Sequence, residues 1–249
     1  MMGVCLQFFF TDDLFGESSA GLRTLRIMEG ASAYNGWLFR QCEPHLRQKI
    51  LEVGAGVGNI TKFLLARPLV VATDYSESYV IELRQKLGHF ANVRVERLDL
   101  LDSESAEGLA RRFAPECVLS MNMLEHIGDD LTALKNMGRL LPTGGRLVLL
   151  VPAHQALFSG MDASLGHFRR YNKRTLFALL DQAGFRVTES RYLNGLGALG
   201  WWVNGRVLRR KLIPSRQLRL FDFVTFLLPL ERFVPLPFGL SVLIVAEKR

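Results

Sequence analysis

Cysteine is scarce in this chain of 249 residues, which contains three: Cys5, Cys42 and Cys117. They lie far apart, and no pair has the two-residue separation that is typical of metal-binding and redox motifs. This pattern argues against a disulfide framework and a cysteine-ligated zinc site, and we expect no metal site. It also favours a reducing compartment, so we expect a cytoplasmic protein.

Long hydrophobic runs are also missing. No stretch without a charged residue reaches the ~20 residues that a helix needs to cross a bilayer. The apolar run 4–10 is not preceded by basic residues and is followed by Asp12 and Asp13, which does not fit a signal peptide. Apolar residues make up 49% of the chain and charged residues 22%, a balance typical of globular proteins.

Much of the net charge of +7 is concentrated in one stretch. Residues 206–219 contain six basic and no acidic side chains, and a second basic cluster lies at 169–174. Each segment either forms a solvated face or attracts an anionic partner, such as a phosphorylated acceptor, a membrane surface or RNA. Because a helix start disfavours basic side chains, Arg169 and Arg170 should lie near an anion. That anion is either an aspartate such as Asp162 or an acidic acceptor.

Short runs of β character alternate with helical segments along most of the chain. The predicted strands are 49–53, 69–73, 93–97, 117–121, 146–151, 185–192 and 241–247, and the predicted helices between them are 59–66, 77–87, 104–113, 130–141 and 173–183. This alternation predicts an α/β fold with a Rossmann-like, mostly parallel sheet of seven strands and helices on both faces.

Residues 194–240 interrupt the alternation. They are rich in Gly, Leu, Phe, Trp and Arg, and they predict helices at 196–210 and 218–233. We interpret the segment as a helical insertion before the last strand, within a single domain that spans 1–249. The other parts of that domain are a helical cap at 1–48, a ligand-binding core at 49–193 and the last strand at 241–249.

The most informative segment joins the first strand to the first helix of the core. Its sequence at 52–58 is Glu-Val-Gly-Ala-Gly-Val-Gly. Glycines allow positive φ and let a ligand approach the main chain, while the following helix offers free N–H groups. A dinucleotide-binding loop would need glycine where this chain has Asn59. Glu52 also disfavours a pyrophosphate and instead suits a ligand with a positive amino group.

Acidic residues follow the next two strands. Asp74 comes 20 residues after Gly54, an offset at which a carboxylate can accept from both ribose hydroxyls. Asp99 follows the third strand, where it could bind the exocyclic amine of an adenine between Leu98 and Leu100. Together these residues predict a site for an adenosine that carries an amino-acid tail.

These motifs resemble those of the class I S-adenosylmethionine-dependent methyltransferases, in particular the small-molecule branch. The resemblance rests on 52–58, Asp74, Asp99 and the sequence Ser-Met-Asn-Met-Leu-Glu-His-Ile at 120–127, and it covers roughly residues 49–192. It implies a seven-stranded sheet whose last strand is antiparallel, and S-adenosyl-L-methionine as cofactor. The cofactor-binding residues we expect are Glu52, Gly54, Ala55, Gly56, Asp74, Tyr75, Asp99, Leu100, Asn122 and Tyr34.

Within this set, the resemblance implies that Glu52 and Gly54 hold the methionine tail, Asp74 the ribose and Asp99 the adenine. Tyr34 either covers the methionine end of the cofactor or packs in the core.

Methyl transfer should occur at the carboxyl ends of the fourth and fifth strands, where an acceptor can approach in line. We expect the catalytic residues among His154, His167 and Tyr171, each of which has a structural role as the alternative. His126 either takes a proton or, as the alternative, orients its loop or touches the cofactor. We further expect the insertion to roof the acceptor pocket, with His154 and Tyr171 below it and the basic cluster 169–174 at its rim.

These features favour an enzyme that methylates an oxygen or nitrogen of a small metabolite. The basic clusters would suit an anionic metabolite. A first alternative is a lipid-linked or glycan precursor at the membrane surface, because Trp201 and Trp202 lie beside basic residues in a segment suited to peripheral contact. A second is an RNA-binding protein that holds the cofactor. The chain lacks the D/N-P-P-aromatic motif of enzymes that methylate base amines, so we do not expect nucleic acid as the acceptor. The oligomeric state stays open.

Overall fold

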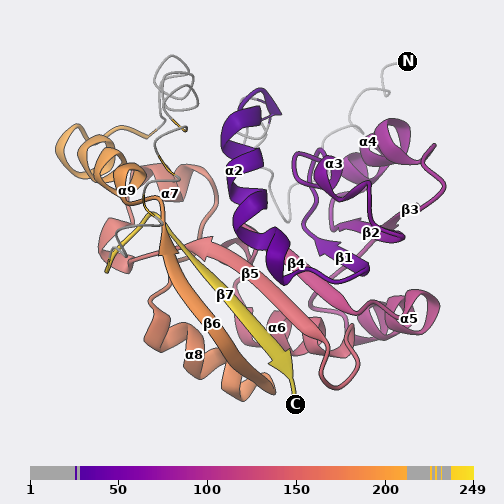
Figure 1. The fold of residues 1–249 in the computed structure, drawn as a ribbon. Helices are drawn as coiled ribbons and strands as arrows, with labels where there is room; N and C mark the ends of the chain where they lie inside the picture. Colours follow the sequence, from indigo (N-terminus) through magenta and orange to yellow (C-terminus); the bar gives the residue numbers. More distant parts are fainter. Residues whose placement is uncertain (1–25, 27–28, 212–224, 226–227, 229–230, 232–236) are drawn as a thin grey trace, which may run out of the picture.

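The computed structural model describes residues 26, 29–211, 225, 228, 231 and 237–249. Seven strands in this part of the chain form one sheet in the order β3-β2-β1-β4-β5-β7-β6 (Figure 1). They are β1 (Lys49–Val53), β2 (Leu69–Asp74), β3 (Val93–Arg97), β4 (Cys117–Met121), β5 (Arg146–Pro152), β6 (Phe185–Leu193) and β7 (Ser241–Lys248). The first five strands are parallel, and β7 lies between β5 and β6, antiparallel to both. The predicted Rossmann-like sheet with an antiparallel last strand is confirmed.

Helices cover both faces of this sheet, as the alternating sequence predicts (Figure 1). The helices α2 (Ser32–Cys42), α3 (Thr61–Leu64) and α4 (Glu77–Leu87) share one core with Ile50, Val70 and Leu119 of the strands. The helices α5 (Ser103–Phe113), α6 (Asp130–Arg139) and α8 (Lys173–Gln182) share the other core with Leu51 and Val71. Because successive strand residues enter opposite cores, the central strands read as continuous apolar runs.

Two helix predictions differ from the structure, for local reasons. The helix expected from position 59 begins only at Thr61, because the residues before it complete the turn of the glycine loop, where Gly58 N–H donates to Ala55 O at 3.0 Å. The helix expected at 196–210 is α9 (Gly195–Trp202), which continues as a π-helical turn at Val203–Val207.

The remaining differences concern shorter elements and the end of the insertion. The sequence did not predict α7 (Gly160–Ser164), in which Ser159 and Asp162 form a capping box at the first turn. The helix expected at 218–233 lies largely outside the described residues, and the division into cap, core and insertion stays a prediction. Among the helices of the described part, none combines the length and apolar character needed to cross a membrane.

Candidate active site

The glycine loop lies at the carboxyl end of β1, beside the ends of β2 and β4. Gly54, Gly56 and Gly58 have φ values of 73°, 56° and 87°, which side chains rarely adopt. At Gly54, a Cβ atom would also stand 2.4 Å from Cγ of Met123. The predicted need for glycine is therefore met at these positions.

Glu52 lies at the base of this loop with a carboxylate that is incompletely bonded. Its side chain is buried, and Oε2 has no hydrogen-bond partner among the described residues. Burial raises the pKa of Glu52 to about 7. A positive amino group at this point would supply the missing donor and restore the charged form. The geometry thus fits the amino-acid end of the cofactor that the sequence implied.

Asp74 ends β2 and is held against the glycine loop by the backbone. Its Oδ2 accepts from Gly56 N–H at 2.8 Å, and its Oδ1 accepts from Ser76 N–H at 3.0 Å. Each carboxylate oxygen can accept more than one hydrogen bond, which is the property that a ribose-binding carboxylate needs. The neighbouring Tyr75 is exposed, and the guanidinium of Arg97 lies 5.1 Å from its ring centroid.

The site expected for adenine follows β3. Asp99 Oδ1 accepts from Leu101 N–H at 2.8 Å, which fixes the carboxylate at the surface of this turn. Leu98 and Leu100 are 3% and 4% exposed and pack in the core beneath the sheet ends. The expectation that their side chains flank the adenine is therefore not supported, because almost no side-chain surface is left for the ring. Leu101, at 44% exposed, is the open apolar side chain of this turn.

Tyr34 and Asn122 approach the same end of the sheet from other elements. The Tyr34 hydroxyl accepts a hydrogen bond from Asn194 Nδ2 at 3.1 Å, and its ring stacks on Trp37 at 5.9 Å. Burial raises the pKa of Tyr34 to about 12, so it stays a neutral phenol. Asn122, directly after β4, has a φ of 51°, and its N–H donates to Leu150 O at 2.8 Å. Tyr34 thus ties α2 to the start of α9, which the sequence did not indicate.

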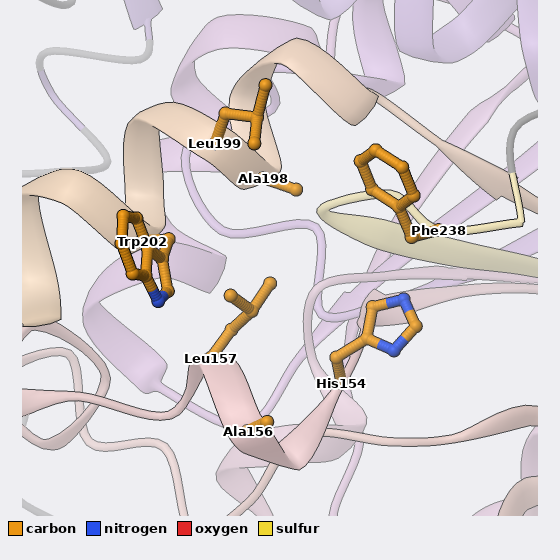
Figure 2. A pocket seen from close by; sticks show the side chains of 7 residues that line it. All are labelled: His154, Ala156, Leu157, Ala198, Leu199, Trp202 and Phe238. Carbon is orange, nitrogen blue, oxygen red and sulfur yellow. The ribbon is translucent and has the colours of Figure 1, made fainter.

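An apolar cavity lies between α9 and the 3-10 helix η3 (Gln155–Leu157), which follows β5 (Figure 2). Its volume is about 490 Å³, within the range typical of small-molecule sites. The lining residues are His154, Ala156, Leu157, Ala198, Leu199, Trp202 and Phe238. The 194–240 segment therefore forms one wall opposite His154, in line with the expected roof. Sequence reasoning did not select Leu199 and Phe238, although their segment is rich in leucine and phenylalanine.

Among the described residues of the cavity lining, His154 is the one whose side chain can exchange a proton at neutral pH. Its backbone has a φ of 63°, and its N–H donates to Tyr171 O at 2.9 Å. The ring stacks on Tyr192 at 4.6 Å, and Nε2 is buried without a hydrogen-bond partner among the described residues. Burial, together with the nearby Arg170, lowers the pKa of His154. The imidazole is therefore neutral at pH 7 and has a free lone pair or N–H to offer.

Tyr171 does not line this cavity, which corrects the expectation that it lies below the insertion and contacts an acceptor. It is 2% exposed, and its hydroxyl donates to Asp130 Oδ2 at 3.1 Å. Burial raises the pKa of Tyr171, and the carboxylate of Asp130 adds to that shift. A hydroxyl that is buried and already donating is unsuited to proton transfer with a ligand.

The basic residues beside Tyr171 have internal partners, which corrects their expected place at the rim. Arg169 Nη1 lies 2.6 Å from Asp130 Oδ2, and Arg170 Nε lies 2.7 Å from Asp162 Oδ1. Of the two anions considered from the sequence, the aspartate is therefore the one that the structure provides. His167 is also away from the cavity lining and lies beside Glu125 and His126 instead.

Comparisons with known proteins agree with this geometry. A family described as a methyltransferase domain matches residues 30–190. A probable S-adenosylmethionine-dependent methyltransferase of Mycolicibacterium smegmatis is 26% identical over 176 residues, which are 66% of this chain and 65% of that protein. A chloroplastic tocopherol O-methyltransferase of Arabidopsis thaliana is 26% identical over 146 residues, 56% of this chain and 40% of that protein. The chain thus spans less than two thirds of the length of both relatives.

A solved structure shows the same fold along most of the chain. It is the complex between the Haloferax volcanii Trm112 methyltransferase activator and a putative methyltransferase. The TM-score is 0.61 at 16% identity, and the match covers 93% of this chain and 96% of the other.

Proposed function

Because this chain belongs to the S-adenosylmethionine-dependent methyltransferases, we propose that it methylates an oxygen or nitrogen of a small acceptor whose apolar part occupies the cavity beside His154. The cofactor supplies an electrophilic methyl group on its sulfonium. The observation that carries the proposal is the lining of the cavity, in which His154 is the single ionisable side chain among the residues that the structure describes. Such a lining binds an apolar body and orients one polar atom.

The expectation of an anionic acceptor loses its main support. Arg169 and Arg170 are paired with aspartates, and the part of the cavity lining that the structure describes includes no arginine or lysine. An anion placed in the cavity would therefore be desolvated without a positive partner from its lining. We accordingly propose an acceptor that is uncharged where it enters the cavity.

His154 is positioned to hold or accept the acceptor's proton at Nε2 or Nδ1. General base catalysis contributes roughly 10²–10⁴-fold, about 3–5 kcal/mol. Alignment of two bound reactants contributes more, up to about 7–11 kcal/mol. The walls of the cavity should therefore matter more for the rate than the histidine does.

The test uses labelled S-adenosylmethionine and cell extracts separated into organic and aqueous fractions. We expect label to enter compounds of the organic fraction. The variant Ala156→Trp, which places an indole in the cavity from an exposed position, should lose this transfer while it keeps cofactor binding. Ala163→Trp is the matched control, because Ala163 is exposed on α7 and outside the lining. Labelling confined to water-soluble compounds, or equal activity of both variants, would refute the proposal.

A second candidate function is methylation of a lipid-linked acceptor at a membrane surface. It is favoured by the exposed side chains that continue from the cavity, which are Trp202, Val203, Val207 and Leu208. Basic side chains, Arg206, Arg209, Arg210 and Lys211, are interspersed with this apolar group. Apolar and basic side chains together suit the headgroup region of an anionic bilayer. Co-sedimentation with vesicles that contain anionic lipid, but not with neutral vesicles, would support this candidate.

A further inference from the structure

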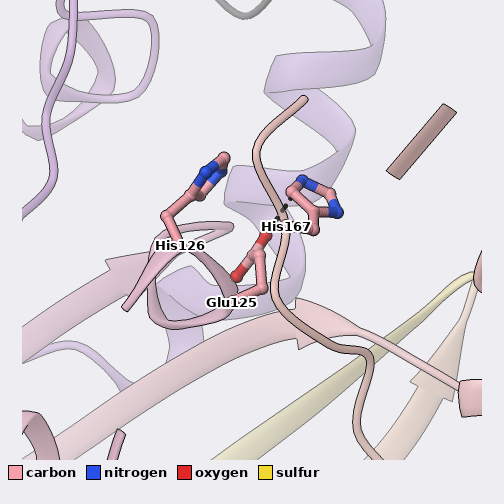
Figure 3. Close-up of side chains that lie close together, drawn as sticks. All are labelled: Glu125, His126 and His167. Atoms are coloured by element: carbon pink, nitrogen blue, oxygen red, sulfur yellow. Dashed lines mark ion pairs between the residues drawn. The ribbon is translucent and has the colours of Figure 1, made fainter. Parts of the chain in front are cut away.

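We infer that Glu125, His126 and His167 form a binding site for a divalent transition-metal ion. One carboxylate oxygen and one ring nitrogen from each histidine lie within 4.8 Å of one another (Figure 3). Two ligand atoms at ~2.1 Å from a shared ion are themselves ~3–4 Å apart. Side-chain adjustments of about an ångström would therefore bring the three into coordination.

The first independent observation is the carboxylate of Glu125, which is fully buried and lacks a partner. It is 0% exposed, and neither Oε1 nor Oε2 has a hydrogen-bond partner among the described residues. His167 Nε2 lies 4.0 Å from Oε1, which is beyond hydrogen-bond distance. Buried carboxylates are normally paired or bound to metal, because an isolated buried charge is strongly unfavourable. A cation at this point would remove that penalty.

The second observation is the orientation of His167. Its Nδ1 lies 3.0 Å from Asp162 Oδ1, which also accepts from Arg170 Nε at 2.7 Å. The tautomer in which His167 Nδ1–H donates to this carboxylate leaves the lone pair of Nε2 facing Glu125. A carboxylate that orients a metal-binding imidazole in this way is a common outer-shell partner.

Asp162 is itself excluded as a ligand by its other contacts. Its Oδ2 accepts from Ser159 N–H at 2.9 Å and from Trp201 Nε1 at 3.3 Å. The third ligand comes instead from His126, the neighbour of Glu125 in the 3-10 helix Leu124–His126. Its ring meets that of His167 edge to face, with centroids 4.7 Å apart. Each of the three ligands thus reaches the same point from a fixed backbone position.

The ligand set indicates the class of ion. Two imidazoles and one carboxylate suit Zn²⁺, Mn²⁺ or Fe²⁺ better than Ca²⁺ or Mg²⁺, which prefer oxygen ligands. Three protein ligands also leave coordination positions open. The site follows β4 directly, and Met123 of the same turn contacts Gly54 of the cofactor loop. The site lies outside the described lining of the cavity beside His154, and its existence does not depend on the proposed function.

The experiment measures metal binding to the full-length protein without a polyhistidine tag. After treatment with EDTA and desalting, the protein is titrated with Zn²⁺ and, separately, with Mn²⁺ by calorimetry, and its thermal unfolding is recorded. We expect one ion per chain and a raised Tm. Glu125→Gln and His167→Gln should each weaken binding at least tenfold, whereas His89→Gln, a histidine of another surface, should not.

The variants also distinguish a Glu125 carboxylate that binds metal from a Glu125 carboxyl group that is buried in its protonated form. Without metal, Glu125→Gln should be as stable as the parent or more so, because it removes an unpartnered buried carboxylate. If Glu125→Gln or His167→Gln does not fold, His126→Gln at an exposed position provides the same comparison. The inference is overturned if the parent protein binds neither ion at millimolar concentration. It is equally overturned if the ligand variants that fold bind as tightly as the parent protein.

Discussion

The indole of Trp201 donates from Nε1 to Asp162 Oδ2 at 3.3 Å, and this bond joins the insertion to the catalytic side of the domain. The same indole lies under the guanidinium of Arg170, at 4.5 Å from its carbon to the ring centroid. Trp201 therefore satisfies a buried carboxylate and covers its arginine partner at once. Its neighbour Trp202 lines the apolar cavity, so the position of the cavity wall depends on this buried ion pair.

The first prediction concerns that pair. Asp162→Asn keeps the shape of the side chain but removes the charge that balances Arg170, whose side chain is 1% exposed. Leaving one partner of a buried ion pair uncompensated destabilises a protein by about 3–5 kcal/mol. We expect a loss of this size in the free energy of unfolding, measured with urea.

Asp181→Asn is the matched control for that measurement. Asp181 pairs with Arg249 at the surface, and both side chains are more than half exposed. An exposed pair contributes about 0–1 kcal/mol, so this variant should be almost as stable as the parent. Equal effects of the two substitutions would show that the Arg170 pair is not structurally important.

The cofactor side of the site could be predicted from sequence because its determinants are local. Each strand end carries its own motif within a few residues, as at Glu52 and Gly54 on β1 and at Asp74 on β2. Parallel strands bring these ends to one edge, so the order of elements is sufficient to gather them. The burial of the Leu98 and Leu100 side chains could not be predicted, because the sequence of a turn does not tell which side chains face the core.

The acceptor side could not be predicted to the same degree, because its contacts join residues distant in sequence. Arg169 finds Asp130 across 39 residues, and Trp201 finds Asp162 across the same separation. No sequence motif predicts such pairs. A cluster of arginines beside a helix start has the same sequence pattern whether its partners belong to the protein or to a ligand. The burial of Tyr171 follows from these pairings and was hidden for the same reason.

The second prediction is a pH dependence of stability in the cofactor-free and metal-free protein. Burial raises the pKa values of Glu52 and Glu125 from an ordinary 4.5 to about 7 each. Between pH 4.5 and 7 the folded state holds protons that the unfolded state releases, so these groups lower the free energy of unfolding as pH rises. The loss is complete above pH 7 and amounts to roughly 3 kcal/mol or less for each group.

Glu52→Gln should therefore gain stability relative to the parent as pH increases over this window. Glu82→Gln offers the opposite case, because a hydrogen bond from Arg26 lowers the pKa of Glu82. The free energy of unfolding of Glu82→Gln should be lower than that of the parent at neutral pH. This difference should disappear as the solution becomes acidic. Urea unfolding at several pH values checks both signs, and a pH-independent difference for Glu52→Gln would contradict the raised pKa.

The third prediction concerns Asp74, which we expect to bind the ribose. Asp74→Ala removes the acceptor for the cofactor hydroxyls and the bond that fixes Gly56 N–H. Cofactor binding should weaken by about 1.5–3 kcal/mol, the scale of hydrogen bonds to a charged group. Calorimetry with S-adenosylhomocysteine measures the change. Asp102→Ala is a suitable control, because Asp102 caps α5 through Glu104 N–H, and an unchanged dissociation constant for Asp74→Ala would place the ribose elsewhere.

The fourth prediction tests the role of the His154 imidazole as a general base, separately from the role of the cavity in binding. His154→Gln keeps a polar side chain but removes the imidazole that can accept a proton. We expect kcat to fall by roughly 10²–10⁴-fold, because a general base contributes on that scale. The KM for S-adenosylmethionine should not change, since Glu52 and Asp74 lie on other strands.

A purely structural role of His154 would give a different pattern. In such a role the ring would only hold the turn in place, through its stacking on Tyr192 at a backbone φ of 63°. In that case His154→Gln would lower the Tm and raise the KM for the acceptor, and the pH profile of kcat/KM would keep its shape. If the imidazole takes the proton, the acidic limb of that profile should disappear in the variant, because the group that must be deprotonated for catalysis is gone. If the acidic limb of the kcat/KM profile is unchanged in His154→Gln, His154 does not act as the general base.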